Sequence, residues 1–233
     1  MGCTVLDGIT GTLNLSKANP ATAEVKAEGE QITQGINSPS SIKLEPLRYG
    51  VSDKWSKELL AQENPAVHAA LLADMYAACD RKITEDVFKK SKEEAREIAT
   101  TFDEAGFNKL MAEVELSGSF AMSRSLFFKG KDVKYDEGSG RRLLELTKQN
   151  GIGNTWEEIQ TFYSSLFKDT AKDTRMVYGA WSEMWIGLWS GLEILINPFT
   201  YQKEGQIEIT VNRLANMGIR NNAAFVKSGH IEG

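Results

Sequence analysis

The last sixty residues constrain the fold of this chain most. From Arg175 onward the sequence is a succession of apolar runs rich in β-branched and aromatic residues, and it contains no arrangement of side chains suited to catalysis. The periodicity predicts strands at Met176–Ala180, Leu192–Ile196, Gln206–Leu214 and Ala223–Lys227. Such a segment is typical of a protein that presents a surface, not one that carries out a reaction.

Three tryptophans, Trp181, Trp185 and Trp189, lie in the tract between the first two of these strands. Their spacing of four fits one face of a helix, but apolar residues on the other faces and the flanking strands favour β structure. Stacking on a ligand is one alternative. Large aromatic side chains more often fill a core or an interface, and we predict that role here.

The first fifty residues alternate in three stretches, which predicts strands at Thr10–Leu15, Ala21–Ala27 and Ser41–Tyr49. Turn-rich sequence separates them. The part from Ser16 to Pro46 has few large apolar residues, so it cannot bury much against its own body. We expect it to project as a long hairpin that is ordered by something else, such as a neighbouring subunit.

A long helix follows. Pro65 suits a first helical position, with Asn64 as its cap, and Leu72, Tyr76, Cys79, Ile83 and Val87 recur at helical spacing. The predicted helix runs from Pro65 to Lys90, about 39 Å at 1.5 Å per residue. A shorter helical piece, Ser56–Gln62, precedes it.

The middle of the chain gives weaker signals. Ser91-x-x-Glu94 and Thr101-x-x-Glu104 both match a capping box, and the second opens an amphipathic helix. A strand is expected at Ser119–Ser123, a helix near Leu126–Lys131 and a loop at Tyr135–Arg142. The stretch from Trp156 to Leu166 fits either a helix or an irregular strand.

Composition excludes several classes of protein. The 233 residues carry a formal net charge of -5, which argues against gripping nucleic acid through its phosphates. No apolar run approaches the ~20 residues needed to cross a bilayer. The two cysteines, Cys3 and Cys79, form no metal-binding or disulfide pattern, and Cys79 falls on the apolar face of the long helix. A reducing cytoplasm therefore suits the folding of this chain.

Candidate chemistry is sparse. Gly151-Ile-Gly153 is half of a dinucleotide fingerprint and lacks its third glycine, so a turn is the better interpretation. The two histidines, His68 and His230, have no visible orienting group, and a chain end holds a catalytic group poorly. Arg141-Arg142 and the paired glutamates fit solvated faces. We assign no catalytic, cofactor or metal residue, and a small α+β enzyme remains a remote alternative.

Taken together, the pieces resemble the major capsid proteins of tailed bacteriophages, which have the Hong Kong 97 fold. The resemblance follows the chain in order. It is carried by Thr4–Leu13, Glu24–Glu30 with Ile42–Leu47, Ser56–Leu60 before the long helix, Phe120–Ser123 with Gly138–Arg141, Val177–Ser182, Gly191–Leu195, Val211–Leu214 and Ala223–Val226.

The resemblance implies an α+β subunit with an extended β-hairpin loop, a spine helix, and peripheral and axial domains. The implied parts are an N-terminal segment (1–15), the extended loop (16–46), a peripheral domain with the spine helix (47–98), an axial domain (99–190), peripheral strands (191–220) and a C-terminal strand returning to the axial domain (221–233). The loop would contact neighbouring subunits through its charged residues, namely Lys17, Glu24, Lys26, Glu28, Glu30, Lys43 and Glu45.

The implied function is structural: self-assembly into an icosahedral shell of hexamers and pentamers that encloses double-stranded DNA without reading its sequence. The implied partners are a portal, a scaffold or maturation protease, and possible cement proteins, with assembly in the host bacterial cytoplasm and a final place in the virion. An encapsulin-like cellular compartment is the alternative. The resemblance leaves open whether an N-terminal region is cleaved.

Some members of this family join subunits by a Lys–Asn isopeptide bond assisted by a glutamate. Here the corresponding acceptor and glutamate positions hold Glu204 and Val211. Covalent joining is therefore not expected for this chain.

Overall fold

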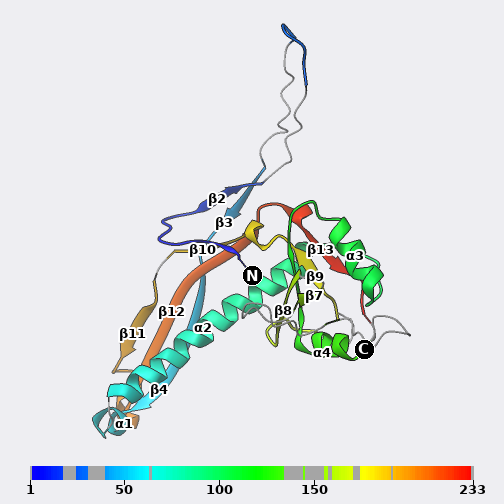
Figure 1. Ribbon diagram of the computed structural model, residues 1–233. Coiled ribbons are helices and arrows are strands. Elements are labelled where there is room, and N and C mark those ends of the chain that lie inside the picture. Colours follow the sequence, from blue (N-terminus) through cyan, green and yellow to red (C-terminus); the bar gives the residue numbers. More distant parts are fainter. Residues whose placement is uncertain are drawn as a thin grey trace.

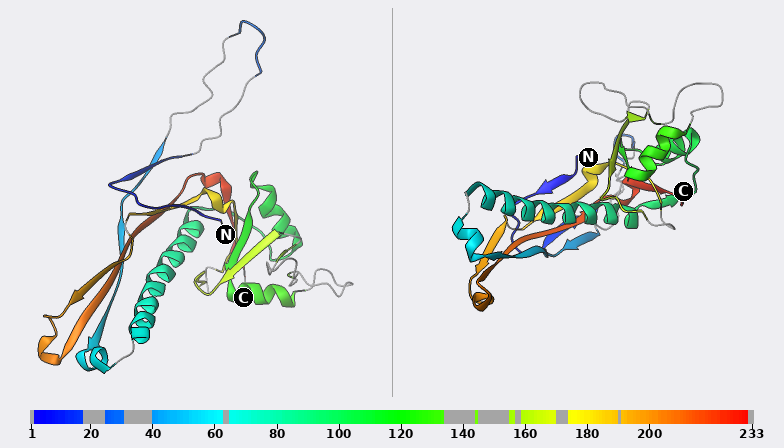
Figure 2. Two further views of the ribbon diagram at one scale, coloured as in Figure 1. Left: turned by 60° about the vertical axis from the view of Figure 1, so that its left-hand side comes forward. Right: turned by 90° about the horizontal axis from the view of Figure 1, so that it is seen from below.

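The computed structural model describes residues 2–17, 25–30, 40–62, 65–133, 144, 155–156, 159–169, 174–189 and 191–231. It has three visible parts. An elongated sheet lies beside one long helix, a compact region of mixed sheet and helix sits at the upper end of that helix, and residues 25–30 lie far out from both (Figures 1 and 2). The predicted α+β class is confirmed.

The elongated sheet is built around one long strand, β12 (Gln206–Ile219). Its neighbours are β1 (Thr4–Leu6), β4 (Leu47–Ser56), β10 (Met184–Leu188) and β11 (Glu193–Asn197). Strands β10 and β11 pair with successive halves of one edge of β12, and β4 pairs with it along Leu47–Ser56; all three pairings are antiparallel. Strand β1 runs parallel to β10.

β12 extends beyond the predicted Leu214. Its burial alternates through Ala215, Met217 and Ile219, all of which are 3 % exposed or less. The strand therefore continues because its inward face still contacts the core. Gly218 interrupts the sequence pattern without ending the strand.

The long helix α2 (Pro65–Glu94) covers one face of this sheet. Its inward side chains meet those of β4 and β12 in a small core formed by Trp55, Met75, Cys79, Ile209 and Val211. The predicted helix is confirmed and is longer than expected. Ser91 does not cap a new helix: it is fully buried, and its hydroxyl donates to the carbonyl of Phe88 inside α2. The helix α1 (Lys57–Gln62) precedes it.

The compact region contains the second sheet, in the order β5-β13-β9-β6-β8-β7. The strands are β5 (Arg96–Ile98), β6 (Ser119–Ser123), β7 (Thr155–Trp156), β8 (Ile159–Ser164), β9 (Val177–Gly179) and β13 (Phe225–Ser228). Two helices, α3 (Glu104–Ala112) and α4 (Arg124–Asp132), belong to this region. Phe107, Phe120 and Leu110 are completely buried in its core.

Several local predictions were only partly right. Asp103, not Thr101, caps α3, because its carboxylate accepts from the amide of Gly106 while Thr101 donates to that carboxylate. Between residues 156 and 166, β8 (Ile159–Ser164) is a strand, which was one of the two alternatives. Short 3₁₀ turns occur at Trp181–Glu183, Gln202–Glu204 and Asn222–Ala224.

Each of the two sheets combines strands that are far apart in the sequence. β10 lies within 99–190 but pairs with β12 of the elongated sheet, and β1 of the N-terminal segment joins them. β13 returns to the compact region, beside β9 and β5. The bounds of the peripheral and axial domains remain predictions. Among the described helices, none has the length and apolarity needed to span a membrane.

Candidate assembly surface

A short two-stranded sheet forms the root of the predicted hairpin. β2 (Leu13–Ser16) and β3 (Ser41–Leu44) are antiparallel, with Ser16 opposite Ser41. The pairing places Leu13, Leu15, Ile42 and Leu44 on one face, and Leu15 and Leu44 are only 4 % and 5 % exposed. The projection therefore starts from an apolar base.

Gly218 of β12 lies under this base. A Cβ atom at Gly218 would lie 3.3 Å from Leu44 Cδ2, so the absent side chain lets the hairpin root approach the long strand closely. This close approach is the packing reason for a glycine inside an otherwise regular strand.

Two side chains of the body hold the chain on either side of the root. Trp189 donates its indole N–H to the carbonyl of Gly11, just before β2. Asn216 of β12 donates its amide to the carbonyl of Glu45, just after β3, at 2.6 Å. Both strands of the hairpin are therefore attached to the elongated sheet where they leave it.

The described tip of the projection is a tight turn. The amide of Glu30 donates to the carbonyl of Ala27 at 3.1 Å, and Gly29 has φ 89°, as the third position of a type II turn requires. All six residues from Val25 to Glu30 are exposed, and they lie well away from the body (Figure 1). Nothing in the described part of this chain provides them with a core.

The predicted loop contacts are spread along the projection. Lys17 is exposed at the end of β2, Lys43 and Glu45 form an exposed ion pair of 2.6 Å at the root, and the charged residues Lys26, Glu28 and Glu30 lie at the tip. The hydrogen bond from Lys43 lowers the pKa of the Glu45 carboxyl. Glu24 lies outside the described residues. The contacts of the seven predicted loop residues with a neighbouring subunit remain a prediction.

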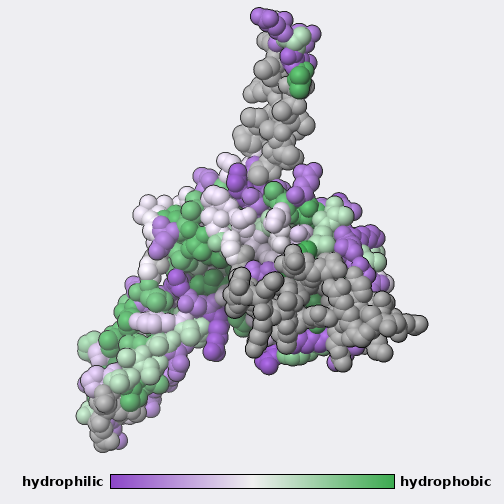
Figure 3. Space-filling model, in the orientation of Figure 1, coloured by the Kyte–Doolittle hydropathy of each residue, from purple (hydrophilic) through white to green (hydrophobic). Residues whose placement is uncertain are grey.

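A second candidate surface was missed by the sequence reasoning. The strand β11, the residue before it and the turn after it expose large apolar side chains, namely Leu192, Ile194, Leu195, Ile196 and Phe199, with exposed fractions from 41 % to 79 %. Hydrophobic surface covers much of this elongated region in the space-filling view (Figure 3). Contiguous apolar patches of this kind mark interaction sites. The signal was present as an apolar run, but a run alone does not reveal exposure.

The three predicted tryptophans have different surroundings. Trp181 is 2 % exposed, its indole donates to the carbonyl of Ser119, and its ring meets those of Phe88 and Phe225. Trp185 is partly exposed, with the guanidinium of Arg220 5.7 Å from its ring centre. Trp189 is partly exposed at the hairpin root. The structure does not bring the three rings together.

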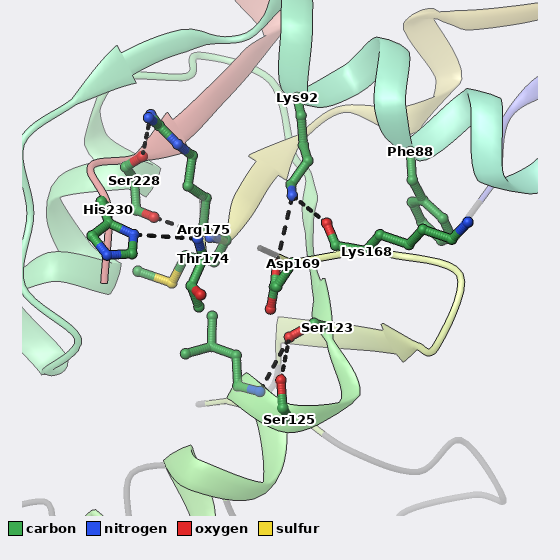
Figure 4. Close-up of polar contacts among 12 residues, drawn as sticks. Phe88, Lys92, Ser123, Ser125, Lys168, Asp169, Thr174, Arg175, Ser228 and His230 are labelled. Carbon is green, nitrogen blue, oxygen red and sulfur yellow. Dashed lines mark hydrogen bonds and ion pairs between the residues drawn. The ribbon is translucent and has the colours of Figure 1, made fainter. Parts of the chain in front are cut away.

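A polar cluster joins the end of α2 to the compact region (Figure 4). The ammonium of Lys92 donates to the carbonyl of Lys168 at 2.7 Å, lies 3.6 Å from the Asp169 carboxylate, and sits over the ring of Phe167. The side chains of Lys92 and Asp169 are 11 % and 12 % exposed. Removing one partner of such a nearly buried pair lowers the stability more than removing one partner of a surface ion pair. This cluster therefore fixes the helix against the compact sheet.

The same view bears on the catalytic alternatives (Figure 4). Ser123 caps α4 and shares a hydrogen bond with Ser125, whereas His230 accepts from the backbone amide of Thr174. His68, in the first turns of α2, stacks on Trp55 of β4. Within the described part of the chain, no cluster of three metal-ligating side chains occurs. Gly151–Gly153 and Arg141-Arg142 lie outside that part.

Neither the family models nor the curated proteins gave a match to this chain. Solved structures did. The chain is similar to the capsid of an empty GTA particle (11 % identity, TM-score 0.72, covering 97 % of this chain and 87 % of that one) and to the mature capsid of bacteriophage PhiM1 (11 %, 0.63, 99 % and 85 %).

A third similar structure is a virus-like particle from Pyrococcus furiosus (9 % identity, TM-score 0.65, covering 97 % of this chain and 90 % of that one). The likeness runs over nearly the whole length in each case. The chain therefore has the fold of phage capsid subunits, as the resemblance of its sequence predicted.

Proposed function

We propose that this chain, with its capsid-subunit fold, is a major capsid protein that assembles with copies of itself into a closed icosahedral shell around double-stranded DNA. The observation that carries the proposal is the combination of that fold over 97 % or more of the chain with a projection whose described tip has no core. A projecting hairpin anchored at its root needs a partner, and in a shell the partner is a neighbouring copy.

The energetics favour assembly by many weak contacts. Burial of apolar area contributes roughly 25 cal/mol per Å², so the exposed side chains of β11 and the hairpin each supply a modest contact. Closure of a symmetric lattice multiplies such contacts without requiring any one of them to be strong. The net charge of -5 fits an inner wall that does not adhere to packaged DNA.

Finer parts of the proposal follow from the sequence resemblance. They are the peripheral and axial domains, hexamers and pentamers as the building units, assembly in the bacterial cytoplasm, and a portal, scaffold or maturation protease, and possible cement proteins as partners. The likeness to capsid structures supports a structural role rather than an enzymatic one.

The hairpin can be shortened without disturbing its root. Because Lys17 and Ser40 continue the register of Ser16 and Ser41, and the amide of Lys17 donates to the carbonyl of Ser40, residues 18–39 can be replaced by Asn-Gly, which suits a two-residue turn that closes a hydrogen-bonded pair. Negative-stain electron microscopy should show closed shells for the parent chain. The shortened chain should stay folded by circular dichroism and fail to form closed shells. Normal shells from the shortened chain would refute the role of the projection.

An encapsulin-like compartment is the second candidate, supported by the likeness to the virus-like particle from Pyrococcus furiosus. The content of purified particles separates the two. Nuclease-protected DNA of defined length supports the viral shell. Particles that hold protein cargo and no protected DNA support the compartment.

A further inference from the structure

β4 and β11 pair with opposite edges of β12 in the elongated sheet, and the outer edges of these two strands differ in chemistry. β4 presents exposed polar and charged side chains, among them Ser52, Asp53 and Lys54. β11 presents Ile194, Leu195 and Ile196, all exposed. Natural sheets protect free edges with charge, and an unprotected apolar edge is a place where another strand adds.

The register of β11 shows that apolar side chains lie on both of its faces. Ile194 and Ile196 lie opposite Val211 and Ile209 of β12, so they share the face that α2 covers. The helix buries Val211 and Ile209 to 0 % and 5 % exposure but leaves Ile196 65 % exposed. Leu195 points to the other face and is 48 % exposed. Among the described residues, only β12 pairs with β11.

We propose that β11 pairs antiparallel with β11 of a second copy, about a two-fold axis that passes beside Leu195. This inference rests on the proposed shell function, because it names one of the contacts between subunits. The pairing joins the two elongated sheets into one continuous sheet. Each copy thereby provides the backbone donors and acceptors that the other copy's edge lacks.

The five residues of β11 are complementary to themselves in this arrangement. Leu195 faces Leu195 of the second copy, Ile194 faces Ile196, and Glu193 faces Asn197, so no like charges lie opposite each other. A two-fold contact requires this kind of self-complementary patch. The turn beyond the strand carries Phe199, 79 % exposed, toward the partner's Gly191, where a Cβ would meet open space.

The alternative of β11 adding to β4 of the second copy is less favourable. It would place Asp53 and Lys54 beside isoleucine and leucine side chains and desolvate two charges. Asp53 already accepts the indole N–H of Trp55, and Lys54 lies 3.6 Å from the ring centre of Tyr201. The β11 strand of a second copy is therefore a better partner for β11 than the β4 strand is.

The contact is small. Stable interfaces bury about 1,200–2,000 Å², and a five-residue strand pair buries much less. We therefore expect the pair in assembled or concentrated protein and little of it in dilute solution. The test must capture a weak contact.

Cysteine cross-linking can capture a weak contact between two copies. In an antiparallel pair, facing Cα atoms are about 4.5–5.5 Å apart, within the ~4.4–6.8 Å that a disulfide needs. Leu195→Cys should give covalent dimers under mild oxidation at high protein concentration. Leu192→Cys is the matched control, since the register separates the two copies of residue 192 by six positions along the strand, roughly 20 Å. The parent chain reports any background from Cys3 and Cys79.

A mixed experiment fixes the register. Ile194→Cys and Ile196→Cys chains should cross-link to each other more than tenfold faster than Ile194→Cys chains cross-link among themselves. Equal rates for all pairs would overturn the proposed register. Leu195→Lys or Leu195→Glu, added to both the Ile194→Cys and the Ile196→Cys chains, should abolish their cross-link. Leu195→Lys in one chain and Leu195→Glu in the other should restore it.

The outcomes separate this inference from the proposed function. Leu195→Cys chains could form closed shells in which the introduced thiol stays reduced under oxidation. This result would contradict the β11 pair and still support the proposed shell function. Dimers linked through position 195 without any shells support the β11 pair and contradict the capsid function. Shells that contain dimers linked at this position support both.

Discussion

In the compact region, Phe107, Phe120 and Phe225 are completely buried by side chains of the same chain, whereas at the tip of the projection every residue from Val25 to Glu30 is exposed. The first region carries its own core. The second has an apolar root, two hydrogen bonds that attach it to the body, and no core at its described tip. The comparison separates what the subunit stabilises alone from what it leaves to its neighbours.

The largest expected effect is in the compact region. Trp181→Ala removes a buried ring and its hydrogen bond to Ser119, and we expect a loss of about 3–5 kcal/mol in the free energy of unfolding. Chemical denaturation followed by circular dichroism measures it. Trp185→Ala, at a partly exposed ring, is the matched control and should cost less than half as much. Equal losses would break the distinction between core and surface.

A smaller, local effect is expected at the root of the projection. Leu44→Ala removes a side chain that is 5 % exposed and packs against Gly218, at a cost of about 2–3 kcal/mol to the local structure. Hydrogen exchange should accelerate in β2 and β3 while the amides of β6 and β9 keep their rates. Leu47→Ala, at a 53 % exposed leucine, should change neither set. Uniform acceleration throughout the molecule would contradict an independently anchored arm.

The attachment by Trp189 should contribute less again. Trp189→Phe keeps an aromatic ring and loses the hydrogen bond to Gly11, which is worth about 1 kcal/mol. Exchange of the amides near Gly11 and in β2 should rise severalfold. Trp181→Phe serves as the control because it removes an indole hydrogen bond to Ser119 in the compact region and none to the hairpin. An unchanged exchange rate in Trp189→Phe would show that the root is held by its leucines alone.

The smallest effect concerns the tie between α2 and the compact region. The hydrogen bond from Lys168 lowers the pKa of the Glu85 carboxyl, with a further contribution from Lys82. A lowered carboxyl pKa gives stability that is present above the ordinary glutamate value, about 4.3, and is lost as the pH falls through the folded-state value. Glu85→Gln should flatten acid unfolding slightly at and below that pH. Glu93→Gln, whose carboxylate lies 3.8 Å from Lys89, should leave the curve nearly unchanged. A larger change for Glu93→Gln would contradict the tie.

The sequence was most informative where one element carries its own periodicity. Cys79, Ile83 and Val87 of the predicted stripe are buried in α2, and the alternation of Ile207, Ile209 and Val211 predicted β12. The low apolar content of residues 16–46 predicted a projection, and its paired root and tip turn are present. Local composition was enough in these cases because each signal lies within a few turns or a few strand residues.

The rest depends on contacts between distant residues. β5 has three residues and exists because it lies beside β13, more than a hundred residues away. Ser91 matched a helix-start motif, but burial against the body kept it inside α2. The exposure of β11 follows from how far α2 reaches across the sheet, which no local pattern of Ile194–Ile196 contains. Both candidate surfaces therefore needed the three-dimensional arrangement.

The central claim is that the projection is completed by a neighbouring copy in a closed shell. Electron cryomicroscopy of the expressed parent chain tests it most directly. We predict closed shells in which residues 25–30 of each subunit contact an adjacent subunit. A monodisperse monomer at high concentration, with residues 25–30 packed onto its own body, would contradict the account.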